Sequence, residues 1–330
     1  MRVLVTGGGS LLARRTAEAL LARGDSVVLL QRHASPLDTE QVLADVRDLA
    51  AVQRAMQRCD GVIHAAAKVG VTGTWSDFRS TNVDGVVNVL DAARRKDVAR
   101  IVHISTPSVA HAGHSLIGAL AEAPIVGRNG AFYAESKAMG ERLALDAAGD
   151  ALPLVVVRPH LVWGPADTQL VGRIVDRARN GRLALIGHGA ALVDTTYIDN
   201  AAAAMVAALD AARPGAACVG KAYVIANGEP RPIAELIAGI LQAARIDVSP
   251  RRVPLAVALR VGTLVEKVWS WRGRADEPPL TRFLAEQLGT AHWFDPRPAR
   301  DDLGWTPRVS IADGLARLAA WFADGSPVAG

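Results

Sequence analysis

The first thirty residues constrain the fold more than any other part of the chain. Arg2–Thr6 is a short aliphatic run, and the turn Gly7-Gly8-Gly9-Ser10 follows it. Residues 11–23 then have the apolar spacing of a helix, and residues 26–30 form a second apolar run. This order predicts a strand–helix–strand unit that binds a dinucleotide, because glycines let the backbone approach a pyrophosphate and the helix N-terminus offers it free N–H groups.

The glycine spacing in this turn departs from the usual pattern. Steps of three from Gly7 lead to Ser10 and Ala13, where small residues replace glycine. Ala13 still permits close helix–strand packing, and Gly8 and Gly9 keep the turn flexible. Taken alone, the turn is also compatible with a plain tight turn.

The end of the second strand, Gln31-Arg32-His33, bears on the choice of dinucleotide. A carboxylate at this place would bind the adenosine ribose hydroxyls and repel a phosphate, whereas Arg32 is suited to pair with a 2′-phosphate. We therefore expect NADP(H) to be favoured over NAD(H), with Arg14 and Arg15 as further candidates. The alternative is that Arg32 is a surface residue without this role.

Strands and helices continue to alternate through residue 106. We expect a third strand just before residues 44–46, a fourth at 61–67 and a fifth at 100–106, with a helix that opens at Asn82 and runs through Arg94. Ligands lie at the carboxyl ends of strands in an open parallel sheet, so the alanines that close the fourth strand leave room for a cofactor. The pattern predicts an α/β fold with a doubly wound parallel sheet.

The segment Tyr133-Ala-Glu-Ser-Lys137 indicates acid–base chemistry. Residues four apart share one face of a helix, so the phenol and the ammonium can point into the same cleft. A nearby cation favours the charged form of an acid, so we expect Lys137 to lower the pKa of Tyr133 towards working pH. Tyr133 is then suited to exchange a proton with an alcohol or ketone. Because such a pair also arises by chance, its weight depends on the rest of the chain.

Taken together, the chain resembles the extended short-chain dehydrogenase/reductase family. The matching segments fall in the family's order: Thr6-Gly7-Gly8, Asp45-Val46, residues 64–67, Asn82-Val83, residues 105–109, Tyr133 with Lys137, and residues 157–165. The resemblance implies a Rossmann domain at residues 1–165 plus about 191–225. It also implies a smaller, mostly helical C-terminal substrate lobe at 166–190 plus about 226–330.

The resemblance also implies roles for individual residues. Tyr133 is expected to be the general acid/base, Lys137 to hold the nicotinamide ribose, and Thr106 to orient the substrate oxygen, with Ser105 and Ser108 as neighbours able to share that role. Asn82 is expected to be a structural capping residue. The residues expected to bind the cofactor are Gly7, Gly9, Ser10, Leu11, Leu12, Arg32, Asp45, Val46, Ala65, Ala66, Ala67, Tyr133, Lys137 and Pro159.

One position separates branches of the family. Nucleotide-sugar epimerases carry an arginine on the sugar nucleotide's pyrophosphate, where this chain has Val193. Residues 193–200, 278–281 and 294–307 instead resemble the 3β-hydroxysteroid dehydrogenase branch, which includes sterol dehydrogenases and bacterial long-chain 2-alkyl-3-oxoalkanoate reductases of olefin biosynthesis. The NADP preference and compact length favour reduction of such an oxoalkanoate. A steroid dehydrogenase, an epimerase and a non-catalytic dinucleotide sensor remain alternatives.

The C-terminal lobe is rich in aromatic and aliphatic residues, which suits a small hydrophobic substrate, although such residues also pack as core. Residues 253–271 form an apolar stretch punctuated by Arg260 and Lys267, consistent with a helix on a membrane, a contact with a partner enzyme or a pocket lid. His160 either touches substrate or is a buried, hydrogen-bonded histidine. Glu141 is expected at the surface.

Composition argues against several other classes. The net charge of +4 arises from 37 Lys+Arg against 33 Asp+Glu, and the basic residues are scattered, so no nucleic-acid partner is expected. Cys59 and Cys218 lie far apart, and His111 and His114 have no third ligand nearby, so neither a disulfide framework nor a metal is expected. No apolar run reaches the ~18 residues of a membrane span. We expect a cytoplasmic protein, peripheral at a membrane at most, and a homodimer by family analogy.

Overall fold

A parallel sheet dominates the structure, a computed structural model that describes residues 1–330 except 71, 111–114, 128–130, 272–280 and 326–330. Within the described residues its seven strands have the order β12-β7-β5-β4-β1-β2-β3, and neighbouring strands are parallel. Their bounds are β1 Arg2–Thr6, β2 Ser26–Gln31, β3 Glu40–Leu43, β4 Gly61–His64, β5 Arg100–Ile104, β7 Leu154–Pro159 and β12 Ala222–Ile225.

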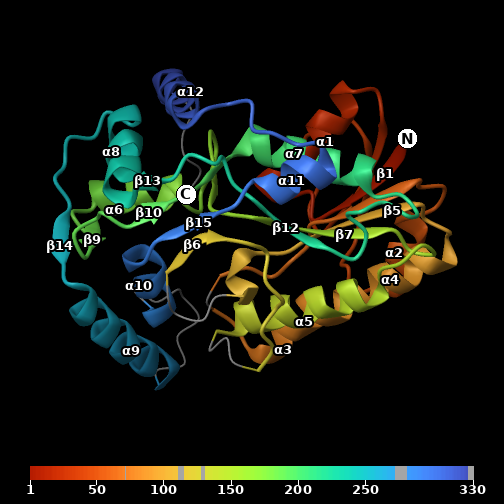
Figure 1. Ribbon diagram of the computed structural model, residues 1–330, viewed down its shortest axis with the longest axis horizontal. Helices are drawn as coiled ribbons and strands as arrows, with labels where there is room; N and C mark the ends of the chain where they lie inside the picture. Colours follow the sequence, from red (N-terminus) through yellow and green to blue (C-terminus); the bar gives the residue numbers. More distant parts are fainter. Residues whose placement is uncertain (71, 111–114, 128–130, 272–280, 326–330) are drawn as a thin grey trace.

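Helices cover both faces of this sheet (Figure 1). One face carries α1 (Leu11–Ala22), α7 (Ile198–Ala211) and α11 (Arg297–Leu303), and the other carries α2 (Leu49–Ala55), α4 (Gly85–Arg95) and α5 (Phe132–Ala147). The predicted α/β fold with a doubly wound parallel sheet is confirmed.

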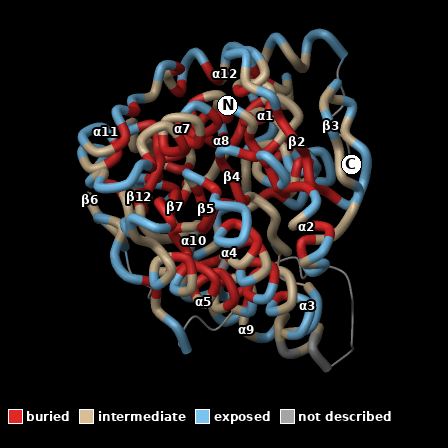
Figure 2. Tube along the Cα trace, turned by 90° about the vertical axis from the view of Figure 1, so that its right-hand side faces the viewer, coloured by how far each residue is buried: buried red, intermediate tan, exposed pale blue. Residues whose placement is uncertain are grey.

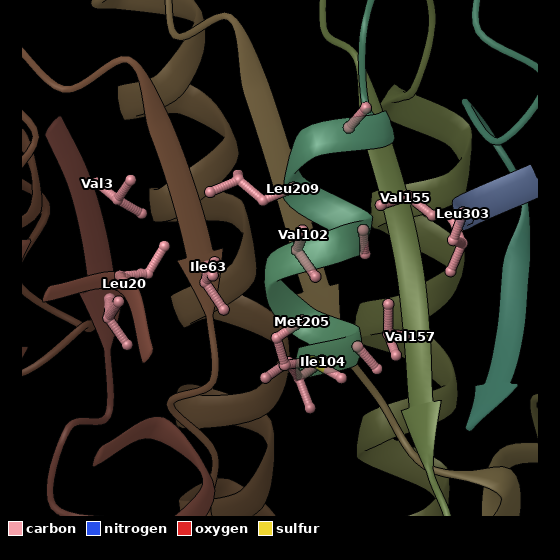
Figure 3. Close-up of a cluster of buried hydrophobic side chains, with 14 of the residues drawn as sticks. Val3, Leu20, Ile63, Val102, Ile104, Val155, Val157, Met205, Leu209 and Leu303 are labelled. Atoms are coloured by element: carbon pink, nitrogen blue, oxygen red, sulfur yellow. The ribbon is translucent and has the colours of Figure 1, made fainter. Parts of the chain in front are cut away.

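The strands are hydrophobic on both faces, as expected for a sheet with helices on each side. In β1, Val3 and Val5 pack towards α1 and α7, whereas Leu4 packs towards α2 and α4. Figure 3 shows the first of these clusters, in which Leu20, Ile63 and other apolar side chains interdigitate. Figure 2 shows the buried sheet within the more exposed helices and loops.

The strand order reverses between β1 and β4. The chain moves outward from β1 to β2 and β3, and β4 then pairs with the opposite side of β1. Such a switch point opens a crevice at the carboxyl ends of the two strands, where ligands bind in open α/β sheets. Gly7 and Ala65, which directly follow β1 and β4, meet at this crevice.

A smaller lobe with its own sheet lies beside the parallel sheet (Figure 1). Its sheet has the order β13-β10-β15-β6, and the strand bounds are β13 Arg231–Pro232, β10 Leu192–Val193, β15 His292–Phe294 and β6 Leu116–Ala119. Two short pairs join β8 (Val162–Trp163) to β11 (Thr196–Tyr197) and β9 (Ala184–Ile186) to β14 (Arg251–Val253). The helices are α6 (Val171–Arg179), α8 (Ile233–Ala243), α9 (Leu255–Trp271), α10 (Arg282–Gly289) and α12 (Ile311–Ala323).

Two expectations differ from this arrangement. Asn82 does not open a helix, because α3 (Trp75–Arg79), a π-helical turn η1 (Ser80–Asp84) and α4 follow one another directly. The proposed division of the chain also needs adjustment: β6 lies before residue 165 yet joins the second sheet, and residues 299–305 pack on the parallel sheet with α7. Long-range strand pairing places β6 and side-chain packing places residues 299–305, and sequence spacing encodes neither contact.

Candidate active site

The glycine turn after β1 is shaped for close approach of a ligand. Gly7 has a φ of +74°, and a Cβ there would lie 2.7 Å from Ala66 Cα, so a side chain is excluded. A Cβ on Gly9 would meet nothing within 4 Å, so this side of the turn is open. Ser10 caps α1 by accepting a hydrogen bond from Ala13 N at 3.2 Å. Ser10 therefore starts the helix at the place where the usual pattern has glycine.

A cavity of about 630 Å³ extends from this turn along the carboxyl ends of β1, β2 and β4. Nine of the predicted cofactor residues line it, and most of them are small: Gly7, Gly9, Ser10, Arg32, Asp45, Val46, Ala65, Ala66 and Ala67. The open glycine turn and the N-terminus of α1 at one end fit the pyrophosphate of a dinucleotide. The residues present therefore fit a nicotinamide dinucleotide.

The far end of the cavity carries charge. The Asp45 carboxylate accepts hydrogen bonds from Arg47 N and Nε, both at 2.9 Å. These bonds, together with the positive charge of Arg32, lower the pKa of Asp45. Arg32 is exposed and lines the cavity beside His33. Arg47 was not predicted, although its position directly after the Asp45-Val46 pair was the available signal.

Other residues of the cavity were also missed. Gln31 ends β2, and the rest come from the loop after β4 and the helical turns that follow it, namely Lys68, Val69, Asp77 and Thr81. Arg15 on α1 pairs with Glu18 of the same helix at 2.9 Å and lies 3.9 Å from Asp199 of α7. Arg14 lies 3.8 Å from Glu18, and a contact of either arginine with a 2′-phosphate stays a prediction. Leu11 and Leu12 begin α1 and pack against the core clusters.

Helix α5 brings Tyr133 and Lys137 to the end of β5. The Thr106 hydroxyl hydrogen-bonds the Tyr133 phenol. Lys137 is 4% exposed, and its ammonium donates to the Ile104 carbonyl at 2.6 Å. Thr106 is only partly buried, whereas Ser105 and Ser108 are buried. Of the three hydroxyls at this strand end, Thr106 is therefore the one that is both accessible and in contact with the phenol.

The pKa of Tyr133 is raised in this structure, whereas we expected it to be lowered. Burial raises the pKa of Tyr133 to about 12, and the hydrogen bond from Thr106 opposes that rise. Burial also lowers the pKa of Lys137 to about 8, against the attraction of Glu141. The Lys137 ammonium is turned towards the Ile104 carbonyl, so the group that hydrogen-bonds the Tyr133 phenol is the Thr106 hydroxyl and not this cation.

Asn82 acts as a structural residue, but not as a helix cap. Its side chain accepts from Lys68 N at 2.7 Å and donates to Lys68 O and to Ser136 Oγ, each at 2.9 Å. Ser136 in turn donates to the Tyr133 carbonyl at 3.0 Å. The π-helical turn places Asn82 between the loop after β4 and α5, and so joins a cavity loop to the helix that carries Tyr133.

Glu141 was expected at the surface and is instead fully buried. It lies one turn beyond Lys137 on the same face of α5, and this face packs on β7. Arg158 in β7 donates to Glu141 from Nε at 3.0 Å and from a second nitrogen, and the two side chains are 1% and 0% exposed. A buried ion pair therefore supports α5 directly behind Lys137.

The remaining candidates lie beside this centre. Pro159 ends β7 and is partly buried. His160 is buried, and its Nδ1 donates to the Asp194 carbonyl at 2.5 Å, which agrees with the hydrogen-bonded alternative. Val193 is 3% exposed within β10, so it offers no group to a phosphate. The pair His111 and His114 lies outside the described residues.

The described part of the chain was searched for disulfides, metal clusters and membrane-spanning helices. Cys59 and Cys218 are both free and buried. Among the described residues, no cluster of three or more histidine, cysteine or acidic side chains is suited to hold a metal ion. Within the same ranges, no helix combines the length and apolar character that crossing a bilayer requires.

The fold and this site define a dinucleotide-binding α/β protein with a Tyr/Lys pair at its centre. Residues 3–226 match the NAD dependent epimerase/dehydratase family. The chain belongs to this family, within the extended short-chain dehydrogenases/reductases, and is an NAD(P)-dependent oxidoreductase.

Particular relatives cover nearly the whole chain. It is 44% identical over 326 residues to a 2-alkyl-3-oxoalkanoate reductase of Stenotrophomonas maltophilia, which covers 97% of this chain and 99% of that protein. It is 39% identical to a protein with the same description in Shewanella oneidensis, over 96% of this chain and 85% of the relative. It is 27% identical to a 3-beta-hydroxysteroid dehydrogenase of Mycolicibacterium neoaurum, over 98% and 92%.

The fold is also that of a solved nucleotide-sugar enzyme. The UDP-glucuronic acid 4-epimerase of Bacillus cereus in complex with NAD superposes with a TM-score of 0.74, at 20% identity over 99% of this chain and 100% of that chain. At this identity the likeness shows the fold alone.

Proposed function

We propose that the protein reduces the 3-oxo group of a long-chain 2-alkyl-3-oxoalkanoate to a secondary alcohol. The observation that carries this proposal is the 44% identity, over nearly the full length of both chains, to a relative described as a reductase of that substrate class. The partly exposed Thr106 beside Tyr133 supports a site for a ketone oxygen.

The proposed chemistry divides between the cofactor and the chain. When bound, the reduced nicotinamide supplies hydride to the carbonyl carbon. Tyr133 gives its phenolic proton to the substrate oxygen, and the Thr106 hydroxyl holds that oxygen in line. Lys137 holds the nicotinamide ribose and stabilises the phenolate left behind, once its ammonium turns from the Ile104 carbonyl. Asn82 and Ser136 keep α5 in register with the cavity loop.

We further propose that the cofactor is NADP(H). Arg32 is exposed at the adenosine end of the cavity, and the nearby Asp45 carboxylate is already engaged by Arg47. A 2′-phosphate would therefore meet a guanidinium instead of a free carboxylate. We expect Arg32→Ala to lower kcat/KM for NADPH by about tenfold and to leave that for NADH within twofold. Equal losses with both cofactors would contradict the assignment.

A 3β-hydroxysteroid dehydrogenase is the second candidate, because relatives of that description also span the chain. Initial rates on a long-chain 2-alkyl-3-oxo acid and on a 3-oxosteroid, each with NADPH and NADH, would distinguish the two. We expect turnover of the oxo acid with kcat/KM at least about tenfold higher than for the steroid, since a mismatched hydrocarbon pocket discriminates by 1–3 kcal/mol. Preference for the steroid would overturn the first proposal.

A further inference from the structure

Helix α9 carries an apolar stripe on its solvent side. Val257, Val261 and Leu264 are 45%, 43% and 62% exposed. Their spacing of four and three residues places them on one face of the helix, on successive turns. Large apolar side chains that are exposed singly need no explanation, but a continuous stripe indicates a binding surface.

The opposite face of α9 is fixed against α10, so the helix cannot turn to bury the stripe. Ala258 and Ala285 are fully buried between the two helices. A Cβ on Gly262 would lie 2.6 Å from Arg282 N, and one on Gly289 would lie 2.5 Å from Leu255. Small residues at these positions hold the two helices at close range. The exposed stripe is therefore a consequence of a defined packing arrangement.

The charge next to the stripe is positive. Arg260 is exposed on α9, and Arg251 and Arg252 are exposed in β14 just before it. The sequence of α9 holds a single acid, Glu266, and its carboxylate accepts from Arg282 N at 2.9 Å on the α10 side. An apolar stripe flanked by arginines complements a surface that is apolar below and anionic above, as a bilayer with acidic headgroups is.

We propose that α9 docks the protein on an anionic lipid surface, with Val257, Val261 and Leu264 in the acyl boundary and Arg260 at the headgroups. Both views of the molecule place α9 on the same side as α5, the helix that carries Tyr133 (Figures 1 and 2). A bilayer against α9 would thus lie on the side of the catalytic helix. The benefit for a membrane-dissolved substrate rests on the proposed function, whereas the docking itself does not.

Flotation of the full-length protein with lipid vesicles tests this proposal. We expect binding to vesicles of phosphatidylcholine with 30% phosphatidylglycerol at low salt. The double variant Val257→Asp, Leu264→Asp should reduce the bound-to-free ratio by about tenfold or more, because two apolar side chains leave the lipid. Arg260→Gln should reduce it by about fivefold on the anionic vesicles only. The matched control is Val87→Asp on α4, which replaces a valine of 46% exposure elsewhere and should bind as the wild type does.

Three results would overturn the proposal. The first is that the wild-type protein does not float with the vesicles, and the second is that the double variant floats as well as the wild type. The third is that the wild-type protein binds no vesicles and is a dimer by light scattering, whereas the double variant is a monomer. The last result would assign the stripe to a second copy of the chain. Turnover of a short, water-soluble 3-oxo ester is measured alongside. If the wild-type protein does not turn over this ester, the proposed function is contradicted, and the flotation result is unaffected.

Discussion

The parallel sheet and the α9–α10 pair are packed through different kinds of side chain. On the sheet, large apolar side chains of β1, β4, β5 and β7 are buried on both faces under helices, and Figure 3 shows the cluster on one face. Among the described side chains of α9, α10 and the adjoining β9, Ala258, Ala285 and Ile186 are buried, and partly exposed residues surround them. The residues proposed for proton transfer lie at the end of the sheet, and the proposed lipid contact lies on the outer face of the pair. Proton transfer needs fixed geometry, whereas contact with a fluid surface does not.

The largest expected effect tests whether chemistry depends on the sheet end alone. Tyr133→Phe removes the proton donor and keeps the ring, so kcat/KM should fall by about a thousandfold, within the range of general acid catalysis. The dissociation constant of the dinucleotide, measured by fluorescence titration, should change by less than about twofold. A variant that retains a tenth of the activity would show that the proton comes from another group.

A matched pair of core deletions measures the difference in packing. Ile63→Ala removes a fully buried side chain of β4, and should lower the unfolding free energy by about 4 kcal/mol. Ile186→Ala, in the α9–α10 cluster, should lower it by about 2 kcal/mol, because the partly buried side chains around it can relax into the cavity. Denaturant titration checks both values. Equal losses would remove the distinction between the two regions.

The buried ion pair of Glu141 and Arg158 behind α5 should contribute to the stability of the sheet core. Glu141→Gln leaves Arg158 buried without its counter-charge and should destabilise the protein by about 3 kcal/mol. The control is Asp199→Asn, which removes one partner of an exposed pair with Arg317 at 3.1 Å and should change stability by less than about 1 kcal/mol. Similar melting temperatures for both variants would contradict the structural role of the pair.

The smallest effect is a pH dependence of stability from Lys137. Its folded pKa is about 8, below the ordinary lysine value of 10.5, so between these values the unfolded chain binds a proton that the folded chain does not. The unfolding free energy therefore rises with pH in this window, by up to about 2 kcal/mol between pH 8 and 10. Lys137→Met should lack this rise. Parallel stability curves for the two proteins over this range would show that burial does not shift the lysine.

Local patterns sufficed for much of the sheet. The strand, turn and helix of the first thirty residues were read from apolar spacing and glycine, and the helix through Tyr133 and Lys137 is present as α5. Arg32, Asp45 and the alanines after β4 line one cavity, as their positions at strand ends predicted. These features follow from interactions between residues that are close in sequence, or from the shared edge of a parallel sheet.

Other features depended on which surfaces meet. The spacing of Tyr133, Lys137 and Glu141 shows that they share a helix face, but not that β5 and β7 cover it. This cover turns Lys137 to the Ile104 carbonyl and buries Glu141 against Arg158. The second sheet likewise combines β6, β10, β13 and β15 from four distant parts of the chain. The spacing of residues along the chain does not predict which distant segments will pair.

The sequence by itself determined the doubly wound sheet, the glycine turn and the helix that carries both Tyr133 and Lys137, because each is encoded in short-range periodicity and residue type. Only the tertiary structure decided the charge environment of Tyr133 and Lys137 and the exposure of the α9 stripe. A pKa depends on the solvent and charges that packing removes or brings near, and exposure depends on which faces of two helices meet. These quantities belong to contacts between distant segments.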